Sequence, residues 1–250
     1  MDTTTFFLMP FLGIALGVLT GALGTGGGLL AVPLLVLGCG LDQKQAQGTA
    51  LVMITISVAK SLKAYHQQGC LDLGKRTLVL AAVGGVMAVI SAVWAIRQAS
   101  PVLQMLYGGF LFFLAAFNWL TKHKSPLKKA LPESWSWTPG VLGGATLGMF
   151  GVGGAALVTP LLRIFFGVSQ LAAQGMSLVF ALPGILLGLG VYVTAGHVAW
   201  VPGILLAVGG FVGAGYGVRW ARNTSPATLS ATFTGILLLA GTAAIASART

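Results

Sequence analysis

The fold is decided by two similar stretches, GALGTGGGLLAVPLL at residues 21–35 and GMFGVGGAALVTPLL at residues 148–162. Each stretch places a cluster of glycines inside an apolar run and follows the cluster with a proline. Glycine disfavours a helix by about 1 kcal/mol per residue relative to alanine. We therefore expect each run to be a helix that is interrupted at its glycines.

Both stretches belong to a longer internal repeat. A shift of 127 residues superposes one on the other, and the same shift aligns further residues that apolar composition alone would not match. These are Ala46, Gln47, Gly48 and Tyr65, which coincide with Ala173, Gln174, Gly175 and Tyr192. Such a repeat indicates a duplicated architecture. We expect a first membrane repeat at 1–121, a basic cytoplasmic linker at 122–137 and a second membrane repeat at 138–250.

Composition places the chain in a membrane. Of its 250 residues, 56% are hydrophobic and only 7% are charged. A membrane helix needs about 20 mostly apolar residues, whereas an outer-membrane barrel would show short alternating segments. The sequence predicts an all-α, multi-pass protein of a bacterial or archaeal cell (inner) membrane. After each interrupted segment we expect three transmembrane helices, near 46–66, 77–97 and 102–121, and near 171–194, 200–221 and 227–247.

The net charge of +10 is better explained by membrane orientation than by nucleic-acid binding, because the basic residues lie mainly between the apolar runs. If each interrupted segment doubles back at its glycines, each half has an odd number of crossings and the second half is inverted. This arrangement places nine basic residues on the linker side and three on the other, against seven and five for parallel halves. We therefore expect an inverted topology, with both termini extracytoplasmic.

The glycine clusters are candidate substrate-binding elements. Irregular backbone at membrane depth persists only where it is buried in protein or lines a wet cavity. A broken helix also exposes N–H groups and a positive dipole end, which suit an anion, and paired broken helices often mark a transporter's binding site. The alternative is that the glycines only allow close packing, as we expect for Gly13, Gly17 and Gly21. The candidate residues are Gly24, Thr25, Gly26, Gly27, Gly28, Gly151, Val152, Gly153 and Gly154.

Polar residues near the start of the next predicted helix form a second candidate group. Gln47 and Gln174 recur at the same offset, and Thr49 and Ser177 follow closely. A neutral amide can donate to an anion, and the alternative role is a hydrogen bond between helices. We expect both tyrosines of the repeat, Tyr65 and Tyr192, to lie in an aromatic belt at the membrane interface.

Two lysines inside a predicted helix, Lys60 and Lys63, have no counterparts in the second half. They can reach the membrane interface with their long side chains. The alternative is that they attract an anion at the pore mouth.

Acidic residues are scarce: Asp2, Asp42, Asp72 and Glu133 all fall in predicted tails or loops. A proton pump normally keeps a carboxylate or a histidine chain inside the membrane, and a cation substrate would find nothing negative except carbonyls. The sequence thus favours an anion substrate. It predicts no metal site, no cofactor and no enzyme constellation. Membrane lipid is an expected partner, oligomers remain open, and coupling could use a proton or sodium.

The paired motif resembles the TauE/SafE sulfite exporter family, also called the toluene sulfonate uptake permease (TSUP) family, over nearly the whole chain. The resemblance implies a secondary transporter of sulfite, thiosulfate or organosulfonates that works by alternating access. It carries over Gly24, Gly26, Gly27 and Pro33, and Gly151, Gly153, Gly154 and Pro160. Val152 and Ala155 replace Thr25 and Gly28, so we expect two unequal half-sites. The alternatives are a passive anion channel and a transporter of a non-sulfur small organic anion.

Overall fold

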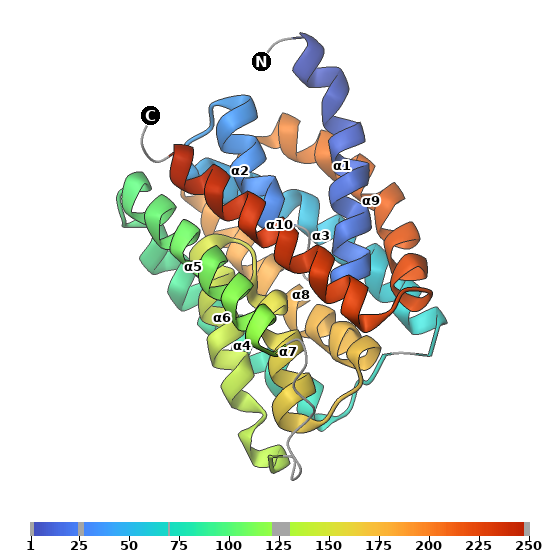
Figure 1. Ribbon diagram of the computed structural model, residues 1–250. Coiled ribbons are helices and arrows are strands. Elements are labelled where there is room, and N and C mark those ends of the chain that lie inside the picture. Colours follow the sequence, from blue (N-terminus) through green and yellow to red (C-terminus); the bar gives the residue numbers. More distant parts are fainter. Residues whose placement is uncertain (1–2, 25–27, 70, 122–130, 248–250) are drawn as a thin grey trace.

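The computed structural model describes residues 3–24, 28–69, 71–121 and 131–247, and these ranges contain helices but no strands (Figure 1). The predicted site residues Thr25, Gly26 and Gly27 and the linker segment 122–130 lie outside the described residues. The helices are α1 (Thr3–Leu23), α2 (Gly28–Cys39), α3 (Gln43–Gln67), α4 (Lys75–Ile96), α5 (Ser100–Thr121), the short η1 (Glu133–Trp135), α6 (Trp137–Phe150), α7 (Gly154–Phe166), α8 (Gln170–Thr194), α9 (Trp200–Arg222) and α10 (Pro226–Ser247).

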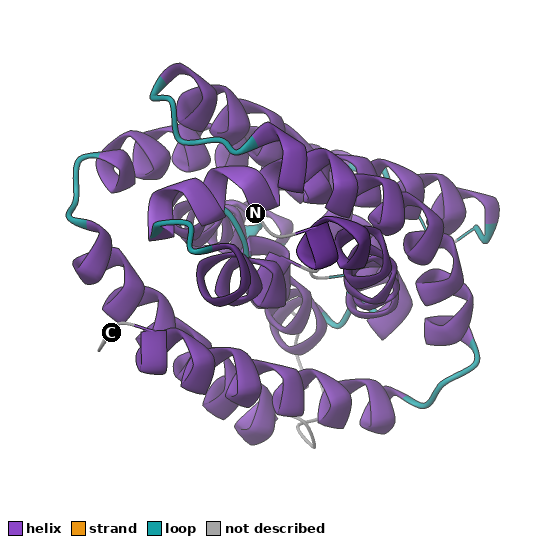
Figure 2. Ribbon diagram, turned by 90° about the horizontal axis from the view of Figure 1, so that it is seen from above, coloured by secondary structure: helices purple, strands orange, loops and turns teal. Residues whose placement is uncertain are grey.

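Among the described helices, α4, α5, α8, α9 and α10 are long and apolar enough to cross a membrane. The chain is therefore a polytopic membrane protein, as its composition predicts. Several helices near the middle of the bundle are seen end-on from above, and others lie obliquely around them (Figure 2).

The described helix bounds agree with an interruption at each glycine cluster. Helix α1 ends at Leu23 and α2 begins at Gly28, while α6 ends at Phe150 and α7 begins at Gly154. Each pair forms an antiparallel hairpin. The start of α1 and the end of α2 share one crevice, and Gly143 of α6 faces Val158 of α7. The chain therefore reverses direction between α1 and α2 and again between α6 and α7.

The two halves run in opposite directions. Helix α3 is antiparallel to α8, since Gly48 lies against Tyr192 and Gly188 against Leu51. Residues further along α1 and α3 contact residues further along α9, so α1 and α3 run parallel to α9. The same pattern shows that α6 and α8 run parallel to α4. Therefore α1 and α6 are antiparallel. Inverted repeats in a bilayer stay a prediction, which these helix directions support.

The first helix of each half packs against a helix of the other half. Helix α1 packs along α9 of the other half, and α6 packs along α4 (Figure 1). A Cβ atom added to a glycine in either interface would collide with a backbone carbonyl group of the facing helix or crowd it. The pairs are Gly13–Leu206, Gly17–Gly210 and Gly21–Ala214, repeated by Gly140–Leu80, Gly144–Gly84 and Gly148–Ala88. The predicted packing role of the first three glycines is confirmed.

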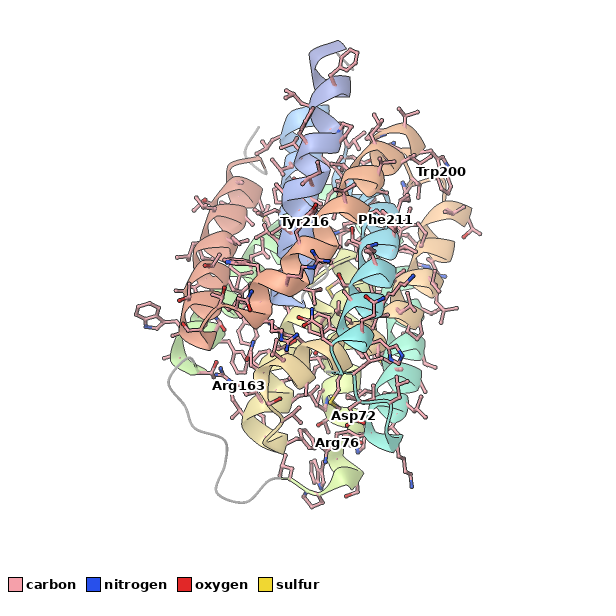
Figure 3. All side chains as sticks on the ribbon, turned by 90° about the vertical axis from the view of Figure 1, so that its right-hand side faces the viewer. Asp72, Arg76, Arg163, Trp200, Phe211 and Tyr216 are labelled. Atoms are coloured by element: carbon pink, nitrogen blue, oxygen red, sulfur yellow. The ribbon has the colours of Figure 1, made fainter. Side chains whose placement is uncertain are left out.

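Most of the described basic residues outside α3 gather at one end of the bundle, which we call the basic end. The Arg76 guanidinium lies 5.1 Å from the centroid of the Phe166 ring, which joins the start of α4 to the end of α7. Lys44 belongs to the opposite end, where its Nζ donates to the Ile96 carbonyl at 3.0 Å. Figure 3 shows Arg163 and Arg76 toward one end and Trp200 toward the other. The topology prediction places the basic end in the cytoplasm.

We predict that Gly144→Ala lowers the free energy of unfolding by about 1–3 kcal/mol, the usual cost of overpacking. The added methyl group would collide with the Gly84 carbonyl oxygen, which is helix backbone and cannot rotate away. Gly109→Ala is the matched control, because a Cβ there meets nothing within 4 Å. The midpoint of thermal unfolding in detergent measures both variants, and equal midpoints would contradict the close packing.

Candidate functional site

The backbone at the two breaks uses conformations that favour glycine. Gly24 has a φ of +63°, and Gly151 and Gly153 have φ values of +69° and +88°. A side chain is strained in this left-handed region, whereas glycine adopts it freely. Gly24 and Gly151 therefore follow the ends of α1 and α6, and Gly153 precedes the start of α7.

The two breaks approach each other in the middle of the bundle. A Cβ built on Gly28 would collide with the Val152 side chain, and one built on Gly153 would lie 3.3 Å from Leu29. Val152 itself is buried. The structure thus brings Gly28 close to Val152 and places Leu29 beside Gly153, whereas Gly24 lies against Gln174 and Gly151 against Gln47.

A glutamine and a tyrosine secure the end of α1. The last carbonyls of a helix have no partner within the helix. Tyr65 Oη lies 3.1 Å from the Gly21 carbonyl oxygen and 3.1 Å from Gln174 Oε1. Gln174 Nε2 donates to the Ala22 carbonyl at 3.1 Å. A side chain from the second half therefore caps a helix of the first half.

The end of α6 carries the same arrangement with the halves exchanged. Tyr192 Oη lies 3.0 Å from Gln47 Oε1 and 3.3 Å from the Gly148 carbonyl oxygen. One atom breaks the symmetry, because Gln47 Nε2 is buried and has no hydrogen-bond partner among the described residues. We call Tyr65 with Gln174 the first lock, and Tyr192 with Gln47 the second lock.

The locks lie toward opposite ends of the bundle. Along α3, Gln47 and Tyr65 are separated by 18 residues, or about 27 Å at 1.5 Å per residue. The first lock lies nearer the basic end, since Tyr65 is close to the end of α3 and Gln174 is close to the start of α8. Each lock is therefore a hydrogen-bonded link between the two halves, and the two links lie toward different ends of the bundle.

The prediction that Tyr65 and Tyr192 form an aromatic belt is wrong. Both side chains are completely buried. A buried tyrosine usually needs a partner for its hydroxyl group, and here the carbonyls of the interrupted helices and the glutamines supply it.

The remaining predicted site residues lie apart from the locks. Thr49 Oγ1 accepts a hydrogen bond from the Ala199 amide at 2.9 Å, before the start of α9. The hydroxyl oxygen of Ser177 lies 2.9 Å from that of Thr159. Lys60 Nζ lies 4.5 Å from the centroid of the Phe211 ring, and Lys63 is exposed.

A small pocket of about 30 Å³, with a mainly apolar wall and several polar groups, extends from the first lock toward the basic end. Arg163 Nη2 donates to the Thr121 carbonyl at 2.8 Å, while its Nε is buried without a hydrogen-bond partner among the described residues. Asn118 Nδ2 donates to Thr234 Oγ1 at 2.8 Å across the pocket wall. The lining residues are Leu23, Asn118, Ala156, Thr159, Pro160, Arg163, Gln170, Gln174, Leu229, Ser230 and Phe233. We call this the Arg163 pocket.

The sequence prediction counted Arg163 only as a charge between helices and did not consider Asn118, Thr159 or Gln170. The repeat carried a usable signal. Thr159 and Arg163 align with Val32 and Val36 of the first half, so the second half is polar at two positions where the first half is apolar.

Comparison with known proteins agrees with this architecture. The family described as "Sulfite exporter TauE/SafE" matches residues 9–244. The chain belongs to the TauE/SafE sulfite exporter family. It is therefore a membrane transporter and an integral, multi-pass membrane protein, and TauE/SafE is not a known enzyme family.

Two TauE/SafE-like relatives carry names of the same kind. The chain is similar to "Probable membrane transporter protein YunE" of Bacillus subtilis (strain 168), with 23% identity over 223 residues, 79% of this chain and 81% of that protein. It is also similar to "Probable membrane transporter protein" of Haemophilus influenzae (strain ATCC 51907 / DSM 11121 / KW20 / Rd). That identity is 30% over 199 residues, 74% of this chain and 72% of the relative.

We predict that Tyr192→Phe lowers the free energy of unfolding by about 1–3 kcal/mol, because Gln47 Oε1 and the Gly148 carbonyl lose a buried donor. Tyr216→Phe is the matched control, since Tyr216 is 62% exposed. Thermal unfolding in detergent compares the two variants. A Tyr192→Phe midpoint no lower than that of the control would show that the second lock adds nothing to stability.

Proposed function

We propose that this TauE/SafE protein is a secondary transporter of a small sulfur-containing anion, of the sulfite, thiosulfate or organosulfonate class, in the cell (inner) membrane. The family description supports the sulfur-containing substrate. The observation that carries the mechanism is the pair of locks, one toward each end of the bundle and each joining the two halves at a helix break.

The locks serve as two gates in this proposal. When a lock opens, the carbonyl end of α1 or α6 loses its capping side chains, and the adjoining hairpin becomes free to move. Because the breaks lie between the locks, opening one lock at a time exposes the central region to one side of the membrane. This sequence of events is alternating access.

The anion is held at the glycine breaks. The first N–H groups of α2 and α7, at Gly28 and Gly154, have no partner within their own helices, and the amide of Gln47 offers one further buried donor. Val152 packs against Gly28 in the present conformation. Substrate entry therefore requires the two hairpins to separate at this contact.

Transport into proteoliposomes tests the proposal directly. Purified protein should take up sulfite, thiosulfate or sulfoacetate with saturable kinetics. An outward gradient of the unlabelled anion should drive uptake of the labelled anion against the concentration difference of the label. Flux that rises without saturation and cannot be driven uphill would identify a channel. Transport confined to carboxylates such as acetate would overturn the sulfur-containing substrate class.

We predict that Gly153→Ala lowers the transport rate at least tenfold. The residue has a φ of +88°, and the added methyl group would lie 2.7 Å from the Phe110 ring, so the second break cannot keep its shape. Gly196→Ala is the matched control, because it has a φ of +74° but meets nothing within 4 Å in the loop before α9. Uptake is normalised to folded protein, and equal rates would exclude a role for the break.

A further inference from the structure

The Arg163 pocket contains a cation for which the described residues supply no ion pair. Arg163 lies in the last turn of α7 and is partly buried. One side of its guanidinium is fixed by the bond from Nη2 to the Thr121 carbonyl, while Nε is buried without a partner among the described residues. The pocket-lining residues include no carboxylate. We propose that this pocket binds one small oxyanion, with the Arg163 guanidinium as the charged ligand.

Electrostatics favours this assignment. A charge removed from water is costly unless it is paired and hydrogen-bonded. Arginine presents its N–H groups in a planar fork that matches the oxygens of an oxyanion. Because the Thr121 carbonyl already orients this fork, an anion entering the pocket meets a fixed donor and compensates its charge.

Neutral donors surround the same space. The side chain of Gln170 lines the pocket and makes no hydrogen bond to another described side chain or backbone group. The hydroxyl of Thr159 lies one helical turn before Arg163 on α7 and now bonds the Ala155 carbonyl and the Ser177 hydroxyl, so it must turn to donate to an anion. These groups can bind the remaining oxygens of an anion whose first oxygens contact Arg163.

The opposite wall limits the size and kind of anion. Leu23, Pro160 and Phe233 give the pocket an apolar side. Its volume of about 30 Å³ equals the room for roughly two water molecules. A sulfite ion or a sulfonate with one or two carbon atoms is therefore favoured, and only after a small outward movement of this wall.

The first half lacks two polar residues of this pocket. Val32 and Val36 occupy the first-half positions of Thr159 and Arg163, so the duplicated half lacks both the hydroxyl and the charge. The inference rests on the proposed transport of an anion. It adds that the charged contact lies toward the basic end, beside Gln174 of the first lock.

Binding of sulfite and sulfoacetate to the purified full chain in detergent tests the inference, by titration calorimetry. Arg163→Gln should weaken binding roughly tenfold to a hundredfold, the effect of losing a hydrogen-bonded charge. Arg163→Lys, which keeps the charge but loses the planar fork, should fall between wild type and Arg163→Gln. Arg219→Gln is the matched control, since Arg219 is exposed and lies outside the pocket. Wild-type affinity in Arg163→Gln overturns the inference.

Arg163 also bonds the end of α5, so the fold could depend on it. A second variant keeps the test decisive if Arg163→Gln does not fold. Thr159→Val removes the pocket hydroxyl while preserving the shape of the side chain, and should weaken binding about threefold to tenfold. Thr146→Val is its control, because that hydroxyl bonds only carbonyls of its own helix, α6. Equal affinities of these two variants overturn the inference.

Transport separates this inference from the proposed function. Saturable sulfite uptake by wild type, with the same KM and rate in Arg163→Gln, refutes the pocket and leaves the transporter intact. Wild type that neither binds nor transports any of the sulfur anions refutes both. A raised KM in Arg163→Gln, with unchanged KM in Arg219→Gln, supports both.

Discussion

The structure depends on one constraint: the carbonyl groups at a helix end inside a bilayer must find hydrogen-bond donors, because lipid offers none. Helices α1 and α6 end inside the bundle at Leu23 and Phe150. Their last carbonyls receive donors from side chains of α3 and α8. Gln174, Tyr65 and Tyr192 thus allow a helix to be interrupted where it could not otherwise end.

Close packing restricts how such a molecule can move. Helix α1 lies against α9, and α6 against α4, at distances that only glycine permits. Each half is thus held by the other along a full interface of interlocking backbones. A rocking motion that separates the halves as rigid bodies would break both interfaces. Movement of the short helices α2 and α7 about their glycine turns would leave them intact, so gating by the hairpins is the less costly route.

The sequence predicted the interruptions and the helix bounds closely, because glycine and uncharged runs act locally. The predicted helix near 46–66 is α3 (Gln43–Gln67), and that near 171–194 is α8 (Gln170–Thr194). The repeat also selected Gln47 and Gln174. The tyrosines were placed wrongly because an aromatic residue near a helix end usually marks the membrane interface. Only the three-dimensional position of the carbonyls of α1 and α6 gives them a buried role.

The pocket could not be predicted in the same way, because it depends on contacts between distant segments. Arg163 meets Thr121 across 42 residues of sequence, and Gln174 meets Ala22 across 152. Charge counting along the chain treats Arg163 as one more basic residue at a helix end.

Because the chain is duplicated, its residues fall into two kinds: those that both halves share and those that only one half carries. Positions that both halves share, such as Gln47 with Gln174 and the packing glycines, hold the breaks and the interfaces. A perfectly symmetric pair of halves would offer two equal half-sites, and a single anion could occupy neither preferentially. Arg163 stands at the repeat position that Val36 occupies in the first half, and this difference removes the equality. Since the added charge lies beside the first lock, an anion bound there would contact Gln174 and bias that gate and not the other. In the proposed mechanism, this asymmetry gives one bound ion a means to distinguish the two sides of the membrane.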